Sequence, residues 1–168
     1  MRASDEMAVR NSEFAKLFDR DTVSDVPLLH ALVVTCMDFR VSPAHFAGIS
    51  LGDAFVLRVI GGRLTEEVMG QIVGADALSE RHGNGLEEVI IVHHTGCATA
   101  SFADGGDLVA ALAARMGTTS EVLHEIAVDD PFRTVAEDVA KLRAHPGLDV
   151  VVTGFVYDLD DGRLTPVR

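Results

Sequence analysis

The sequence predicts an α/β fold in which a central, mostly parallel β-sheet is flanked by helices. Short, continuously apolar runs, typical of strands that are buried on both faces, alternate with longer segments of helical periodicity. The chain has 168 residues, of which 48% are hydrophobic, so it can bury a substantial core. Because we find neither an internal repeat nor a long linker, we expect one domain over residues 1–168.

The first half of the chain is predicted to form a helix, two strands and a second helix. Residues 5–19 have the pattern of an amphipathic helix, and the apolar runs at 31–35 and 54–60 have the length of buried strands. A helix over 66–81 is indicated by Thr65, which can cap its N-terminus. The apolar side of the first helix carries Met7, Phe14, Leu17 and Phe18.

The second half is predicted to add a strand, three helices and two more strands. The last helix is the best defined, because Asp130 can cap it and Pro131 suits its first position. The turn at 160–162 then reverses the chain into a short, antiparallel fifth strand. The other predicted ranges are 88–92 and 150–156 for strands and 107–116, 120–127 and 131–144 for helices.

The charge of the chain limits its partners. Acidic residues outnumber basic ones by 26 to 14, which gives a formal net charge of −12. This balance argues against nucleic acid and against an anionic membrane surface, since both are bound mainly through Lys and Arg. No apolar run approaches the roughly 20 residues of a membrane-spanning helix. Asp5, Glu6 and Glu13 interrupt the N-terminal segment, so it does not look like a secretory signal and we expect a cytoplasmic protein.

Two cysteines and a histidine follow two of the predicted strands. Cys36 comes directly after the first strand, and His94 and Cys97 follow the third. In a sheet of order 2-1-3-4, these two loops lie side by side where the strand order reverses, which is where open parallel sheets bind ligands. Two thiolates and one imidazole suit zinc and leave a fourth tetrahedral position for water or substrate. The alternative is that both cysteines are ordinary buried thiols.

A carboxylate and a guanidinium lie close to the first proposed ligand. Asp38 is two residues from Cys36, and Arg40 can grip a carboxylate with two parallel hydrogen bonds. Asp38 could therefore orient a hydroxide on the metal, while Arg40 keeps the Asp38 carboxylate ionised and away from the metal. The alternative is that Asp38 only caps the following turn and that Arg40 is a surface charge.

Four segments resemble the β-class carbonic anhydrases, zinc enzymes that interconvert carbon dioxide and bicarbonate. They are Cys36-Met-Asp-Phe-Arg40, Gly52-Asp-Ala-Phe-Val-Leu-Arg58, Gly61-Gly62 and His94-Thr-Gly-Cys97. The likeness extends over roughly residues 25–165 and is closest to the short archaeal and mycobacterial branch.

This resemblance implies a cofactor, a catalytic pair and an assembly. Cys36, His94 and Cys97 would bind Zn²⁺, and Asp38 and Arg40 would form the family's catalytic dyad. The protein would be a homodimer or tetramer whose N-terminal helix packs on a neighbouring subunit.

The resemblance also points to a substrate pocket. Where the family usually has Arg-Asn-Ala-Gly, this chain has Arg58-Val59-Ile60-Gly61. We therefore expect Val59, Ile60, Gly61 and Gly62 to line a pocket that is less polar than usual. The two glycines could let the backbone approach the substrate, or could only permit a tight turn.

The leading hypothesis is a lyase in which zinc-bound hydroxide attacks the small-molecule substrate carbon dioxide and forms bicarbonate. The first alternative is hydrolysis of carbonyl sulfide or carbon disulfide, which the apolar Val59 and Ile60 would suit. The second is a catalytically silent zinc-binding member of the family. His93 is expected to pack structurally on the opposite face of its strand, and no catalytic role is assigned to Asp53 or Arg58.

Overall fold

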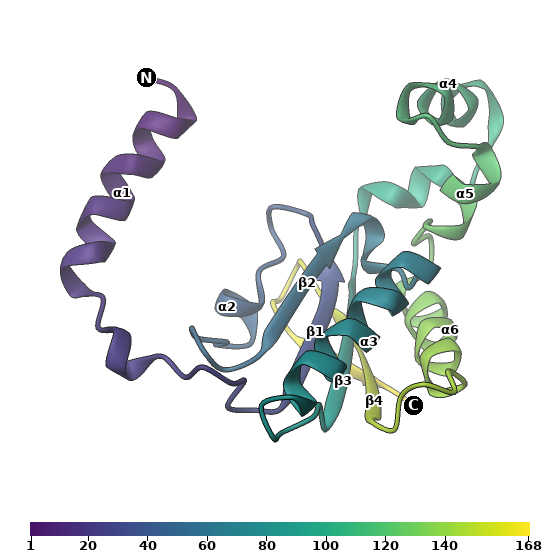
Figure 1. Cartoon of the computed structure of the whole chain (residues 1–168). Helices are drawn as coiled ribbons and strands as arrows, with labels where there is room; N and C mark the ends of the chain where they lie inside the picture. Colours follow the sequence, from purple (N-terminus) through teal and green to yellow (C-terminus); the bar gives the residue numbers. More distant parts are fainter.

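The computed structural model describes all 168 residues and is built around a five-stranded sheet (Figure 1). Its strand order is β2-β1-β3-β4-β5, and the first four strands are parallel while β5 runs antiparallel to β4. The strands are β1 (Ala31–Cys36), β2 (Phe55–Val59), β3 (Glu88–His94), β4 (Val151–Tyr157) and β5 (Leu164–Val167). The predicted α/β class, strand order and antiparallel last strand are therefore confirmed.

Helices occupy all the predicted segments, with bounds that differ by a few residues. The Thr65 side chain accepts a hydrogen bond from the Val68 N–H at the start of one helix, and Asp130 caps another by accepting from Phe132 and Arg133. The helices are α1 (Ala3–Leu17), α2 (Pro43–Phe46), α3 (Glu66–Glu80), α4 (Gly106–Met116), α5 (Ser120–Glu125) and α6 (Pro131–Arg143). Unpredicted elements are α2 and three 3₁₀ turns, η1 (Arg20–Thr22), η2 (Ile60–Gly62) and η3 (Ala98–Phe102).

The main core lies between one face of the sheet and the helices α3 and α6. Alternate strand residues point to this face, where they pack against apolar side chains of the two helices. At Gly154 on β4 the packing is so close that a Cβ atom would come within 2.8 Å of Val139 Cγ2 on α6. The core residues of the strands are Leu32, Val34, Val89, Ile91, Val152 and Val156, and those of the helices are Val68, Met69, Ile72, Val135, Val139 and Leu142.

The second face of the sheet and its β2 edge are less covered. On this second face, Phe46 of α2 stacks on Tyr157 of β4 with a ring separation of 4.6 Å. On the edge strand, Phe55 and Val56 remain exposed. These surfaces leave apolar area available on the single chain.

Helix α1 projects away from the sheet (Figure 1), and none of its residues is buried. Its apolar side chains, including Met7 and Phe14, are largely exposed, and the rings of Phe14 and Phe18 lie 5.5 Å apart. No helix in the structure has both the length and the apolar character needed to span a membrane.

Candidate metal centre

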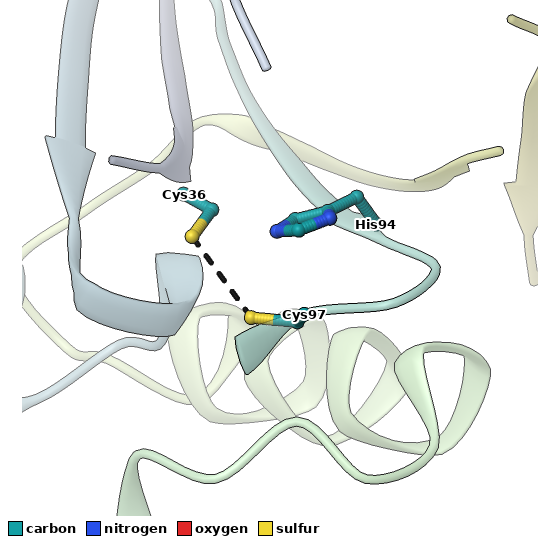
Figure 2. Close-up of side chains that lie close together, drawn as sticks. All are labelled: Cys36, His94 and Cys97. Carbon is teal, nitrogen blue, oxygen red and sulfur yellow. Dashed lines mark hydrogen bonds between the residues drawn. The ribbon is translucent and has the colours of Figure 1, made fainter. Parts of the chain in front are cut away.

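The three predicted metal ligands meet at the carboxyl edge of the sheet. Strands β1 and β3 are parallel neighbours, so Cys36 at the end of one lies beside His94 at the end of the other. Cys97 follows His94 by three residues and returns toward the same point. One ligand atom from each of the three buried residues lies within 4.8 Å of the other two, and the sulfurs are 4.0 Å apart (Figure 2).

The geometry of His94 fits a metal ligand. Its Nδ1 lies 2.9 Å from the Thr95 carbonyl oxygen, which can only accept, so Nδ1 carries the hydrogen. The remaining nitrogen, Nε2, is buried and has no hydrogen-bond partner, and the ring is directed toward the two sulfurs (Figure 2). A carbonyl partner on the outer nitrogen is the usual way in which proteins orient a metal-binding histidine.

The donor set fits zinc in type and spacing. Sulfurs bound tetrahedrally to zinc at about 2.3 Å would lie about 3.8 Å apart, close to the 4.0 Å between Cys36 and Cys97. Soft thiolates also argue against magnesium or calcium. The cluster can therefore hold zinc and keep one coordination position free.

The two cysteines are electrostatically unequal. Their mutual hydrogen bond and burial raise the pKa of Cys36 above its ordinary value. The same bond lowers the pKa of Cys97, although burial opposes this, and hydrogen bonding with Thr99 lowers it further. The two sulfurs are therefore coupled through their hydrogen bond and lose their protons as a pair.

Asp38 and Arg40 form a two-pronged ion pair beside the cluster. Arg40 Nε donates to Asp38 Oδ1 over 2.9 Å, and Arg40 Nη2 donates to Oδ2 over 2.7 Å. These hydrogen bonds hold the pKa of Asp38 well below its usual range, so the carboxylate stays ionised. Arg40 Nη2 also donates to the Gly96 carbonyl over 3.1 Å, which ties the loop after β1 to the loop after β3.

Comparison with known proteins identifies the family. The family model for carbonic anhydrase matches residues 31–164, which include the four parallel strands and every residue of the cluster. The chain belongs to the β-carbonic anhydrase family. Membership confirms the predicted resemblance and supports the predicted enzyme class, a lyase of the carbonic anhydrase kind.

Individual relatives are similar to this protein over most of its length. Beta-carbonic anhydrase 1 of Mycobacterium tuberculosis is 29% identical over 172 residues, covering 99% of each chain. A carbonic anhydrase structure from Streptococcus mutans has a TM-score of 0.82 and 29% identity, covering 100% of this chain and 99% of its own. A carbon disulfide hydrolase of Acidianus is 28% identical, covering 79% of this chain and 74% of its own.

Arg58 contacts the backbone beside the candidate cluster, although the sequence suggested no catalytic role for it. From β2 its Nε donates to the Cys36 carbonyl over 3.2 Å and its Nη2 donates to the Asp38 carbonyl over 2.6 Å. Arg58 therefore supports the backbone that carries the candidate ligand Cys36 and the ion-paired Asp38. The strand register could have indicated this contact. Cys36 of β1 pairs with Val59 of β2, which places Arg58 beside the loop that follows β1.

A cavity of about 280 Å³ opens beside the candidate metal ligands. Of the four residues expected to line the pocket, Ile60 and Gly61 do so, whereas Val59 and Gly62 lie outside this cavity. The lining residues are Cys36, Met37, Asp38, Ile60, Gly61, Cys97, Ala98, Thr99 and Phe102. A larger hollow of about 610 Å³ lies between α2 and β2 and contains none of the candidate ligands.

The two glycines serve close backbone packing. Gly61 has φ +70°, and a Cβ there would come within 2.6 Å of the Ile126 carbonyl oxygen. Gly62 has φ +72°, and a Cβ there would lie 3.0 Å from the Cys36 backbone nitrogen. Side chains at either position would force apart the η2 turn and the segments that surround the cluster.

His93 lies outside the candidate metal cluster, on the α6 side of β3. It is fully buried, with Nδ1 2.8 Å from Thr134 Oγ1 and Nε2 3.3 Å from Asp138 Oδ2. Asp138 also pairs with Arg63 over 2.9 Å and accepts from the Leu64 N–H. This network anchors the segment after η2 to α6. His93 therefore has structural partners and is not part of the candidate metal cluster.

Proposed function

We propose that this protein catalyses the reversible hydration of carbon dioxide to bicarbonate with one zinc ion held by Cys36, His94 and Cys97. The observation that carries the proposal is the ionised Asp38, gripped at both oxygens by Arg40, in the wall of the cavity that the two candidate thiolate ligands also line. The family membership of the chain supports the same reaction.

Zinc in such a site lowers the pKa of water and so supplies a nucleophile at neutral pH. The protein supplies the surroundings that this chemistry needs. Cys36 and Cys97 as thiolates balance the double positive charge of the ion, and His94 adds a neutral ligand. Because the charge is balanced, the nucleophile depends on an oriented hydrogen-bond acceptor nearby.

Asp38 is that acceptor in our proposal. Its carboxylate cannot be protonated near neutral pH, because Arg40 holds its pKa well below the usual range. It can therefore accept a hydrogen bond from the attacking oxygen and aim the oxygen lone pair at the substrate carbon. Arg40 acts as a positioning residue that keeps both carboxylate oxygens away from the metal.

The cavity suits an uncharged, linear substrate. Ile60, Ala98 and Phe102 contribute apolar walls, so carbon dioxide can enter without losing hydrogen bonds to water. Bicarbonate is an anion and gains little from these walls, which favours its release.

The apolar walls also favour a second candidate function, hydrolysis of carbonyl sulfide or carbon disulfide. Two carbon disulfide hydrolases are 28% and 27% identical to this chain. Stopped-flow hydration of carbon dioxide, run beside sulfide-release assays on both sulfur compounds, separates the two functions. Faster sulfide release would replace the first proposal with the second, and zinc-loaded protein without any turnover would exclude both.

We further propose that the protein assembles as a homodimer or tetramer in which α1 packs on a neighbouring subunit. The support is that α1 has no buried residue in the single chain and leaves an apolar side uncovered. The exposed Phe55 and Val56 on the edge strand β2 offer further contact area.

A further inference from the structure

The hydroxyl group of Thr99 contacts the sulfur of Cys97. Thr99 lies in η3, is 6% exposed, and places its Oγ1 3.1 Å from Cys97 Sγ. The structure contains no other hydrogen-bond partner for this hydroxyl. A buried hydroxyl group whose single partner is a sulfur atom is expected to affect that sulfur.

The direction of this hydrogen bond follows from the chemistry of the ligand. A cysteine binds a metal as its thiolate, which has no hydrogen to donate. The Thr99 hydroxyl must therefore donate, and it draws electron density from the sulfur. Hydrogen bonds to cysteine sulfur tune the electronic properties of copper and iron–sulfur centres in the same way.

The second sulfur is supported differently. Cys36 Sγ accepts from the backbone N–H of Asp38 over 3.4 Å, a contact that no side-chain substitution removes directly. Only Cys97 has a side-chain donor. Room for that donor depends on Gly61, since a Cβ at position 61 would lie 3.3 Å from Thr99 Oγ1.

We propose that Thr99 is a positioning residue that tunes the metal through Cys97. By donating to the thiolate, it weakens the electron donation of Cys97 and leaves a bound zinc ion a stronger Lewis acid. This inference rests on the proposed zinc site. Two thiolate ligands balance the charge of the ion, and the hydrogen bond from Thr99 offsets part of their electron donation.

The test uses cobalt(II), which reports on its sulfur ligands by absorption, in the full-length protein. Thr99→Val keeps the shape of the side chain and removes the hydroxyl, while Thr99→Ser keeps the hydroxyl. Ser101→Ala is the matched control, because Ser101 lies in the same turn and donates to the Ala98 carbonyl instead of a sulfur.

We expect Thr99→Val to shift the sulfur-to-cobalt charge-transfer band to longer wavelength, because the thiolate electrons become easier to remove. The weaker d–d bands should keep a tetrahedral intensity. Thr99→Ser and Ser101→Ala should keep the wild-type band.

An unshifted band in Thr99→Val, or the same shift in Thr99→Ser, would overturn the inference. A change in the d–d bands with the charge-transfer shift would assign Thr99 a purely structural role. These outcomes are distinct from failure of the proposed function, since wild-type protein that takes up no cobalt has no such metal site. A band shift in the cobalt-loaded protein, together with no hydration activity in the zinc-loaded protein, would support Thr99 and reject the reaction.

Discussion

Arg40 and Asp38 meet in parallel, with Arg40 Nε 2.9 Å from Asp38 Oδ1 and Arg40 Nη2 2.7 Å from Oδ2. The arginine thus occupies both oxygens of a carboxylate whose backbone lies two residues from a candidate metal ligand. This grip holds the carboxylate in place and keeps it from swinging toward a bound metal ion, and substitution of Arg40 tests the restraint.

Arg40→Ala should leave about one zinc per chain but lower carbon dioxide hydration by roughly 10²–10⁴-fold. The freed Asp38 can then coordinate the ion and block the fourth position. Metal analysis and stopped-flow kinetics measure the two quantities. Arg163→Ala is a matched control, because Arg163 follows Asp161 with the same spacing, its backbone N–H donates to Asp161 over 2.9 Å, and neither residue belongs to the cluster. Wild-type turnover in Arg40→Ala would reject the dyad.

Cys97→Ser should lose most of its zinc, because a hard hydroxyl oxygen replaces a soft thiolate. Zinc content after dialysis against a weak chelator measures this loss. His82→Gln changes an exposed histidine outside the cluster and should retain the metal. Unchanged zinc affinity in Cys97→Ser would remove this residue from the site.

Arg58→Met should reduce turnover by about 10- to 100-fold while zinc remains bound. The substitution removes the two hydrogen bonds that hold the carbonyls of Cys36 and Asp38. Arg58→Lys should recover little of the lost turnover, since a single ammonium group cannot donate two hydrogen bonds in the fixed geometry of a guanidinium. Arg115→Met on the exposed side of α4 serves as the control. Equal turnover in Arg58→Met and this control would show that the loop needs no such support.

Asp138→Asn should destabilise the fold at pH 7 by about 3–5 kcal/mol, because it leaves Arg63 without its nearly buried charge partner. Burial would raise the pKa of Asp138, but hydrogen bonds and charges from His93 and Arg63 lower it overall. A lowered pKa contributes stability above the unfolded value of about 3.9, and this contribution disappears as pH falls below it.

Urea unfolding of wild type and Asp138→Asn at several pH values between neutral and acidic measures this contribution. The difference between the two proteins should be largest near pH 7 and should shrink as the pH falls below about 4. Asp129→Asn changes an exposed carboxylate and should alter stability little. A difference that is constant with pH would contradict the assignment.

Deletion of residues 1–20 should dissociate the proposed oligomer and leave the fold of the remaining chain intact. No residue of α1 is buried in the single chain, so its loss uncovers no core. Sedimentation measures the assembly, and near-ultraviolet circular dichroism measures the packing. A full-length protein that sediments as a monomer at high concentration would refute the assembly.

Much of the fold could be predicted because its signals are local. The buried strands are short apolar runs, and Thr65 and Asp130 mark helix starts by capping side chains. The candidate ligands follow from these elements, because strand order alone brings Cys36 beside His94.

The unpredicted parts depend on contacts between distant segments. The η2 turn packs Gly61 against the carbonyl of Ile126, a residue from a different part of the chain that no local pattern identifies. The role of Arg58 depends on the register of β2 against β1, which brings a long side chain beside a neighbouring loop. Likewise, no local pattern shows that Val59 and Gly62 lie outside the cavity.

An ion bound to the cluster of Cys36, His94 and Cys97 would also reduce the conformational entropy of the unfolded chain. Its two sulfurs come from positions 61 residues apart, so an ion bound to both closes a loop of that size. Closing such a loop in an unfolded chain costs about 4 kcal/mol at 25 °C in the chain-entropy model, as for a disulfide. In the folded protein this entropy has already been lost, because the neighbouring strands β1 and β3 hold the two ends of the loop together. An ion in this cluster would therefore act as a cross-link between two halves of the sheet.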